Sequence, residues 1–97
     1  MPKKPIHIKK GKADHDSEPL SKKASDEAQW FSDDDAYTIT FTPDNPFVSG
    51  PSFQLPARGS VSSGPIASNA VDHKKYKYDV VKVGAAAGAD PDVEINP

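Results

Sequence analysis

The sequence contains no cysteine. Disulfide bonds, thiolate catalysis, cysteine-ligated zinc and iron–sulfur clusters are therefore excluded. A chain of 97 residues without such cross-links depends on its hydrophobic core, and a chain of this size buries about 60–65% of its unfolded surface. We therefore expect a single domain over residues 1–97, with a frayed basic tail at residues 1–4.

Long apolar runs and uninterrupted helical patterns are also absent. Ten prolines and six glycines divide the chain, whereas a helix needs about 10 uninterrupted residues with an apolar spacing of about 3.6. No run approaches the roughly 20 apolar residues of a membrane span. The N-terminal stretch MPKKPIHIKKGK has no apolar segment of the kind found in signal peptides. If the chain is the complete gene product, we expect it to be cytoplasmic.

Neither sign of charge is in large excess. The net charge of −2 is too balanced to indicate a nucleic-acid or membrane partner. A basic N-terminal stretch could form a nucleic-acid-binding arm, but the aromatic residues are placed for a core and are not interleaved with these lysines. We interpret the stretch as a solubilising tail and expect no nucleic acid and no membrane partner. Its lysines are Lys3, Lys4, Lys9, Lys10 and Lys12.

The most informative segment is AQWFSDDDAYTITFT, residues 28–42, which contains the only tryptophan. Apolar and polar positions alternate on both sides of Ser32-Asp33-Asp34-Asp35, which is typical of two half-buried strands. Short Ser and Asp side chains favour a turn between them, because they hydrogen-bond to their own backbone. The segment therefore predicts a hairpin. The expected core consists of Trp30, Tyr37, Ile39, Phe41, Tyr78 and Val80.

Further short strands are predicted at residues 6–8, 19–21, 60–62, 75–83 and 93–95, the last pairing back onto the strand before it. Residues 10–18 are expected to form a loop. Residues 22–27 read as a polar turn, with a helical turn at residues 25–28 as the alternative. Residues 47–56 are expected to form an extended connection. These elements together predict an all-β, antiparallel Greek-key β-sandwich of about seven short strands.

A series of short motifs between Pro19 and Ile95 resembles the cupredoxin-like domains. The motifs are QWFSDDDAYTITF, a proline-rich connection, SGPI, YKYDVV and DPDVEI. The likeness is to a group of small bacterial proteins of that fold that lack a copper site. It implies a seven- or eight-stranded Greek-key sandwich of the cupredoxin or immunoglobulin-like kind.

The resemblance also implies where a copper site would lie. Copper-binding members carry a histidine just after the turn of the tryptophan hairpin, and a cysteine followed by a second histidine after a strand like Tyr76–Tyr78. In this sequence the first place reads Asp35-Ala36-Tyr37, the second falls near Val80, and residues 81–89 contain no histidine. Blue copper needs two histidines and a cysteine. No type 1 copper site can form, so the resemblance does not imply that this protein transfers electrons through copper.

Other candidate chemistry is sparse. His7, His15 and His73 are far apart, and Asp14-His15-Asp16 could offer nitrogen and oxygen ligands to a divalent metal. The acids at residues 33–35 lack the spread of oxygen ligands that a calcium loop needs, and a solvated turn is the favoured reading. A Ser-His-Asp hydrolase is disfavoured, because no serine lies in a G-x-S-x-G turn.

We therefore expect a non-enzymatic β-sandwich that acts as a binding or structural module, without catalytic residues, cofactor or metal. The alternative is a metal-handling protein that uses His15 and nearby carboxylates. The partner would be another protein or a second copy of the chain, held at the sheet edges or at an exposed apolar patch. The residues expected to form this interaction patch are Phe47, Val48, Phe53 and Leu55.

Overall fold

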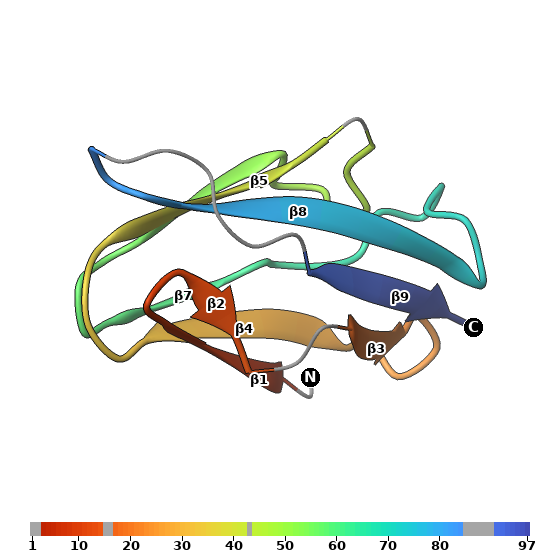
Figure 1. Ribbon diagram of the computed structural model, residues 1–97. Coiled ribbons are helices and arrows are strands. Elements are labelled where there is room, and N and C mark those ends of the chain that lie inside the picture. The colour runs from red at the N-terminus through yellow and green to blue at the C-terminus, as the bar shows by residue number, and fades with distance from the viewer. Residues whose placement is uncertain (1–2, 15–16, 43, 85–90) are drawn as a thin grey trace.

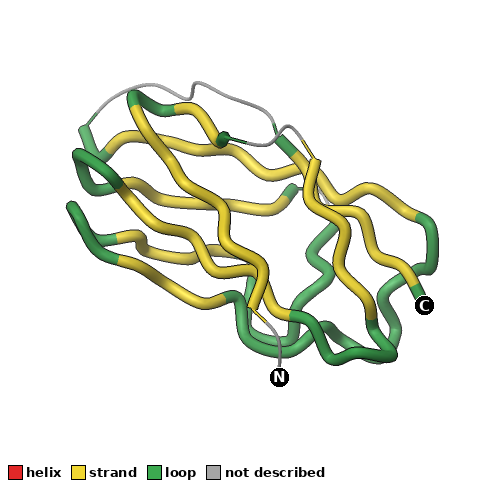
Figure 2. The backbone as a smooth tube through the Cα atoms, turned by 90° about the horizontal axis from the view of Figure 1, so that it is seen from below, coloured by secondary structure: helices red, strands yellow, loops and turns green. Residues whose placement is uncertain are grey.

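The computed structural model describes residues 3–14, 17–42, 44–84 and 91–97 (Figures 1 and 2). These residues form strands joined by turns and loops, and none of them is helical. A helix long and apolar enough to cross a membrane is therefore not found in this part of the chain. The strands are β1 (Lys3–Lys9), β2 (Lys12–Ala13), β3 (Ser17–Ser21), β4 (Glu27–Ser32), β5 (Tyr37–Phe41), β6 (Ser52–Leu55), β7 (Ser60–Ser62), β8 (Lys74–Lys82) and β9 (Asp92–Asn96).

The strands form two sheets that pack against each other. One sheet has the order β2-β1-β4-β7 and the other has the order β3-β9-β8-β5-β6 (Figure 1). The predicted all-β sandwich is confirmed, as are the strands expected at residues 19–21, 60–62, 75–83 and 93–95. The Greek-key connectivity stays a prediction.

The expectation of antiparallel pairing throughout is wrong for two strand pairs. β1 runs parallel to β4, and β3 runs parallel to β9. Parallel neighbours need a crossover connection, because the chain must return to the same end before it pairs. Between β1 and β4 that crossover passes through β3, which belongs to the other sheet. The period-2 pattern of each strand is the same in either direction, so it did not reveal this.

The hairpin predicted over residues 28–42 is also wrong. β4 pairs with β1 and β7, whereas β5 pairs with β6 and β8 in the opposite sheet. The acidic turn at residues 33–36 is therefore an arch between the sheets. Trp30 and Tyr37 both point inward from their own sheet and are buried. An arch buries the same alternate positions as a hairpin, so the sequence pattern fits both.

Three smaller expectations change as well. Lys3 and Lys4 pair with Glu27 and Ala28 inside β1, so they are not part of a frayed tail. The loop expected over residues 10–18 contains β2 and the start of β3. Residues 22–25 form a turn and not a helical one, with β4 beginning at Glu27.

The connection expected over residues 47–56 is partly a strand. β6 pairs antiparallel with β5, so that Phe53 lies opposite Ile39 and Leu55 lies opposite Tyr37. Phe47 forms an isolated bridge with Ile66 just before this strand. The alternation of Phe53 and Leu55 with serine and glutamine fits this strand, although the surrounding prolines and glycine obscure it.

An aromatic cluster around Trp30 fills the space between the sheets. The indole ring lies 5.3 Å from Phe53 and 5.6 Å from Tyr78, measured between ring centroids. Phe41 and Phe47 pack against it at 6.1 and 6.3 Å, in the tilted and edge-on arrangements that aromatic pairs prefer. The predicted core is confirmed, since each of its six residues is buried.

Candidate functional site

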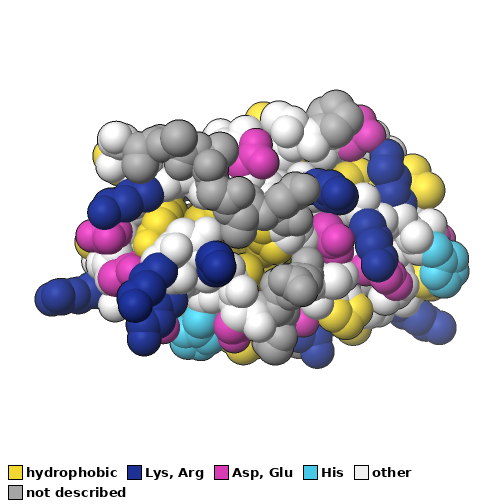
Figure 3. All heavy atoms as spheres, viewed as in Figure 1, with side chains coloured by type: hydrophobic (Ala, Val, Ile, Leu, Met, Phe, Trp, Pro, Cys, Tyr) yellow, Lys and Arg dark blue, Asp and Glu magenta, His cyan; other side chains and the backbone are white. Residues whose placement is uncertain are grey.

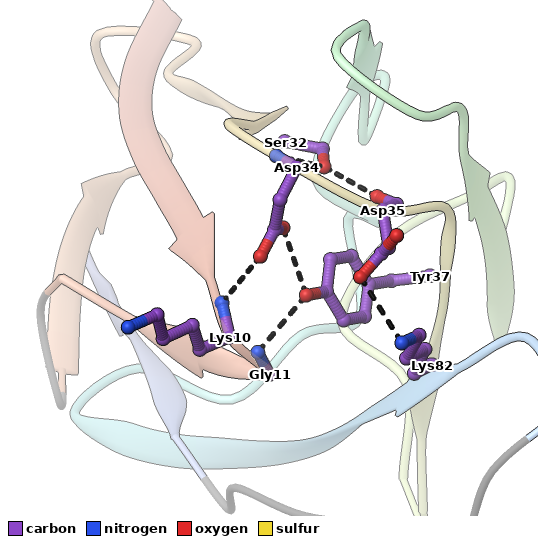
Figure 4. A network of polar contacts seen from close by, with 7 residues as sticks. All are labelled: Lys10, Gly11, Ser32, Asp34, Asp35, Tyr37 and Lys82. Atoms are coloured by element: carbon purple, nitrogen blue, oxygen red, sulfur yellow. Dashed lines mark hydrogen bonds and ion pairs between the residues drawn. The ribbon is translucent and has the colours of Figure 1, made fainter.

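The arch between β4 and β5 meets two other segments at one end of the sandwich. The turn that joins β1 to β2 lies on one side of it, and the last residue of β8 lies on the other (Figure 4). The residues drawn there form a network of polar contacts. They are Lys10, Gly11, Ser32, Asp34, Asp35, Tyr37 and Lys82.

Tyr37 is at the centre of this network. Its ring is buried, and its hydroxyl donates to Asp34 Oδ1 at 2.8 Å while accepting from the Gly11 backbone N–H at 3.0 Å. Asp34 Oδ2 accepts from the Lys10 backbone N–H at 2.9 Å. Lys10 has φ of 53° and Gly11 has φ of 77°, a backbone shape that turns both N–H groups toward the arch. One carboxylate and one hydroxyl thus join the β1–β2 turn to the arch.

The arch is held from its other side as well. The Ser32 hydroxyl donates to the Asp35 carbonyl and accepts weakly from the Asp34 N–H at 3.3 Å. The Asp35 carboxylate forms an ion pair with Lys82 Nζ at 3.2 Å, between side chains that are about half exposed. The acids at positions 34 and 35 therefore turn to different partners and do not share a cation-binding pocket.

The two ionisable groups at the centre shift in opposite directions. The Lys10 backbone N–H, aided by Tyr37 and Lys82, holds the pKa of the Asp34 carboxyl below its ordinary value of 3.8. Burial, followed by the hydrogen bond to the Asp34 carboxylate, raises the pKa of Tyr37 above 10.0. The proton therefore stays on the phenol, and the carboxylate stays ionised. Such a pair orders the backbone and is poorly suited to exchanging a proton with a substrate.

Asp34→Asn is expected to reduce the acid sensitivity of folding. Because the pKa of Asp34 is lowered by folding, its carboxylate contributes stability above pH 3.8 that is lost as the pH falls through the folded-state pKa. Urea unfolding at pH 6 and at pH 3 measures this difference. The variant should be less stable at pH 6 and should lose less on acidification. Asp79→Asn, which removes a partly exposed acid on β8, serves as the control, and equal acid sensitivity of wild type and Asp34→Asn would contradict the expectation.

Of the positions named in the cupredoxin-like resemblance, Asp35-Ala36-Tyr37 lies at this end of the sandwich, beside the end of β8. The Val83 backbone N–H donates to the Ala36 carbonyl at 3.1 Å, and Tyr37 pairs with Lys82. Val80 lies in the core opposite Ile39. Residues 85–90 of the following loop lie outside the described residues.

The remaining metal hypotheses depend on other residues. His15 and Asp16 lie outside the described residues, so the metal-handling alternative stays a prediction. His7 and His73 are exposed, and they lie in different elements, His7 within β1 and His73 in the turn before β8. Within the described residues, no three His, Asp or Glu side chains gather as a metal site would require.

The expected interaction patch does not form as an exposed surface. Phe47, Phe53 and Leu55 are buried in the core, with exposed fractions of 2%, 7% and 1%, and only Val48 of the four is exposed, at 67%. From the sequence we expected some of them to be partly exposed, because a sandwich has little room in its core for all four. β6 provides that room, because its inward positions pack onto Trp30 and its neighbours.

A different surface stands out on the four-stranded sheet. Inward positions of β1, β4 and β7 are filled by the core, and the alternate positions point to solvent. Two rungs cross this outer side, Pro5–Gln29–Ser62 and His7–Phe31–Ser60. We name it the Phe31 face, and it comprises Lys3, Pro5, His7, Lys9, Gln29, Phe31, Ser60 and Ser62.

Phe31 and His7 form the centre of the Phe31 face. Their rings are stacked, with centroids 5.0 Å apart and planes 16° from parallel. His7 Nδ1 lies 3.6 Å from an Asp33 carboxylate oxygen in the arch, and about half of each of these two side chains is exposed. The alternation in the sequence placed Phe31 on the other face of its strand from Trp30. It did not connect Phe31 to His7, because only the parallel register of β1 and β4 brings these two residues together.

Shallow clefts also lie elsewhere among the described residues, and two of them adjoin a lysine. The larger, about 280 Å³, is lined by Thr42, Asp44 and residues 74–77 where β5 and β8 diverge. Lys74 Nζ is paired there with Asp44 at 2.7 Å and lies over the Tyr76 ring at 4.9 Å. The smaller cleft, about 190 Å³, adjoins Lys22 and residues 65–68. Lys22 Nζ already bonds the Ala70 carbonyl at 2.6 Å and Asp72 at 3.0 Å. In both clefts a lysine is thus held by groups of the protein itself.

Comparisons of the chain with protein-family models, with curated proteins and with solved structures find no match.

Proposed function

We propose that the chain is a non-enzymatic β-sandwich module that binds another macromolecule through the Phe31 face. The observation that carries this proposal is the position of Phe31. The chain has four phenylalanines, three tyrosines and one tryptophan, all among the described residues, and every one except Phe31 is buried. A large aromatic side chain on the solvent side of a sheet, next to a stacked histidine and a proline, is typical of a contact surface.

The edges of the sheets are less suitable for binding a partner strand. β6 is four residues long and lies between Pro51 and Pro56, and β3 contains Pro19. β2 has two residues and β7 has three. Short edge strands and proline are common ways in which proteins prevent edge-to-edge pairing. The broad face is therefore favoured over the edges.

The polar network at the end of the sandwich supports a role without catalysis. Asp34, Tyr37 and Lys82 each bond to another group of the protein, and their contacts join three segments of the chain. The cupredoxin-like resemblance to proteins without a copper site is in keeping with this. The end of the sandwich then provides rigidity, and the Phe31 face provides the contact.

Phe31→Ser is expected to abolish partner binding without unfolding the protein. Wild type, Phe31→Ser and Val48→Ser would be coupled to resin and exposed to a lysate of the source cells, and the retained proteins and nucleic acids compared. Val48 is the matched control, because it is an exposed apolar residue outside the Phe31 face. A specific partner should be retained by wild type and Val48→Ser and lost with Phe31→Ser.

The purified partner should then shift the amide resonances of β1, β4 and β7 in NMR spectra of the ¹⁵N-labelled protein. Circular dichroism of Phe31→Ser must show the wild-type spectrum. Equal retention by all three proteins, or shifts confined to the other sheet, would count against the Phe31 face as the binding surface.

A further inference from the structure

We propose that the Phe31 face binds single-stranded nucleic acid, with bases stacked on Phe31 and His7 and phosphates paired with the lysines at the β1–β2 end. This inference rests on the proposed function and names the class of partner. It also revises the expectation from sequence, which excluded nucleic acid because the aromatic residues appeared to serve the core. Phe31 does not serve the core, and the strand next to it carries lysines.

The geometry of the face suits unpaired bases. His7, Phe31 and Ser60 follow one another across three neighbouring strands, which lie about 4.8 Å apart in a sheet. The two rings are already stacked on each other, and the side chain beyond Phe31 is a small, exposed serine. On the adjacent rung, Gln29 offers an amide within the same surface, whereas the Ser62 hydroxyl donates to Glu27. Single strands bind proteins by stacking bases on such aromatic side chains.

The charges of the face suit a phosphate backbone. Lys9 and Lys12 are register partners at the end of β1 and β2, and both are exposed. At the opposite end Lys3 faces Glu27, whose buried carboxylate accepts from the Ser62 hydroxyl at 2.8 Å. Figure 3 shows Lys and Arg side chains around the β1–β2 turn, interspersed with Asp and Glu side chains and beside a histidine. The exposed charges within these strands are therefore lysines, whereas the exposed acids Asp14 and Asp33 flank the face next to His7.

Single-stranded nucleic acid is the partner that uses both features. A neutral glycan could contact Phe31 but would leave the lysines without a role. An acidic peptide or a sulfated polysaccharide would pair with the lysines but would not need the rings. Duplex nucleic acid keeps its base faces stacked inside the helix, where a flat sheet cannot reach them. Two exposed acids lie beside His7 and oppose an approaching phosphate: Asp33, 3.6 Å from the imidazole, and Asp14, whose carboxylate accepts from the His7 backbone N–H at 3.0 Å.

The test uses fluorescence anisotropy with a labelled oligo(U) of about 12 nucleotides, a length within the usual range of single-strand binding sites. The wild-type protein is expected to bind it, with affinity that falls as salt rises. Phe31→Ala is expected to weaken binding by about fivefold or more, which corresponds to the loss of one stacked base. Lys9→Gln combined with Lys12→Gln is expected to reduce the slope of log K against log salt by about 1.4, or about 0.7 for each cation lost.

Three controls make the result specific. Lys75→Gln removes an exposed lysine from the opposite sheet and should leave binding unchanged. Asp33→Asn should tighten binding, because it removes one of the two acids at the border of the face. A duplex of the same length should compete poorly, and heparin should compete only in part, because it pairs with the lysines but has no base to stack on the rings. Because Phe31→Ala could alter folding, the two lysine substitutions and Asp33→Asn, all at exposed positions, provide an independent readout.

Two results would overturn the inference. One is the absence of oligo(U) binding at low salt. The other is binding that heparin competes fully and that Phe31→Ala does not weaken, which would show a polyanion contact without base stacking. If oligo(U) fails but a protein from the lysate still needs Phe31, the proposed function stands and the nucleic-acid inference falls.

Discussion

Replacement of Trp30 by alanine is expected to lower the free energy of unfolding by about 3–5 kcal/mol, the usual cost of truncating a buried aromatic side chain. Trp30 is fully buried, and four aromatic rings lie with centroids 5.3 to 6.3 Å from its own. These rings come from β5, β6, β8 and the segment before β6, so the cavity would open between the two sheets. A chain of this length is usually stable by about 5–15 kcal/mol. The loss is therefore a large part of the total.

Urea unfolding followed by far-UV circular dichroism measures the effect of Trp30→Ala, since the variant has no tryptophan fluorescence. Phe31→Ala is the matched control, because it removes the next side chain of the same strand on the outer side of the sheet. It should cost about 1 kcal/mol, the typical effect of a single substitution. A loss within about 0.5 kcal/mol for Trp30→Ala would place the indole at the surface and contradict the described core.

Phe47→Ala is expected to destabilise the protein by about 3–5 kcal/mol, although it lies in a proline- and glycine-rich stretch. Its ring packs edge-on against Phe41 at 5.4 Å and against Phe53 at 6.0 Å. Its backbone is fixed too, because its N–H donates to Asn45 Oδ1 and its carbonyl accepts from Asn45 Nδ2. Removal of the ring would leave Trp30 without one wall of its pocket.

Val48→Ala is the control for Phe47→Ala, since the adjacent side chain is 67% exposed. It should change stability by no more than about 0.5 kcal/mol, as surface substitutions usually do. Sedimentation equilibrium on both variants would test for self-association at the same time. If Phe47→Ala kept its stability and altered association, the segment would be an exposed contact after all, as the sequence suggested.

The sequence by itself determined the class of fold and the inward side of most strands. Alternation at residues 28–32, 37–41 and 75–81 identified the buried side chains, because successive side chains of a strand point to opposite faces whatever its neighbours are. The same rule placed Phe31 away from Trp30. The absence of cysteine excluded thiolate chemistry in the same direct way, since it depends on residue type alone.

Only the tertiary structure decided which strands are neighbours. The sequence of the acidic turn is compatible with a hairpin and with an arch between sheets. The sequence pattern of β1 is likewise the same whether it pairs parallel or antiparallel with β4. For the same reason the sequence did not predict that His7 and Phe31 would stack, or that Tyr37 would meet Gly11 across the end of the sandwich. Alternation is a local property of one strand. Pairing depends on how distant segments close the core together, and many pairings bury the same side chains.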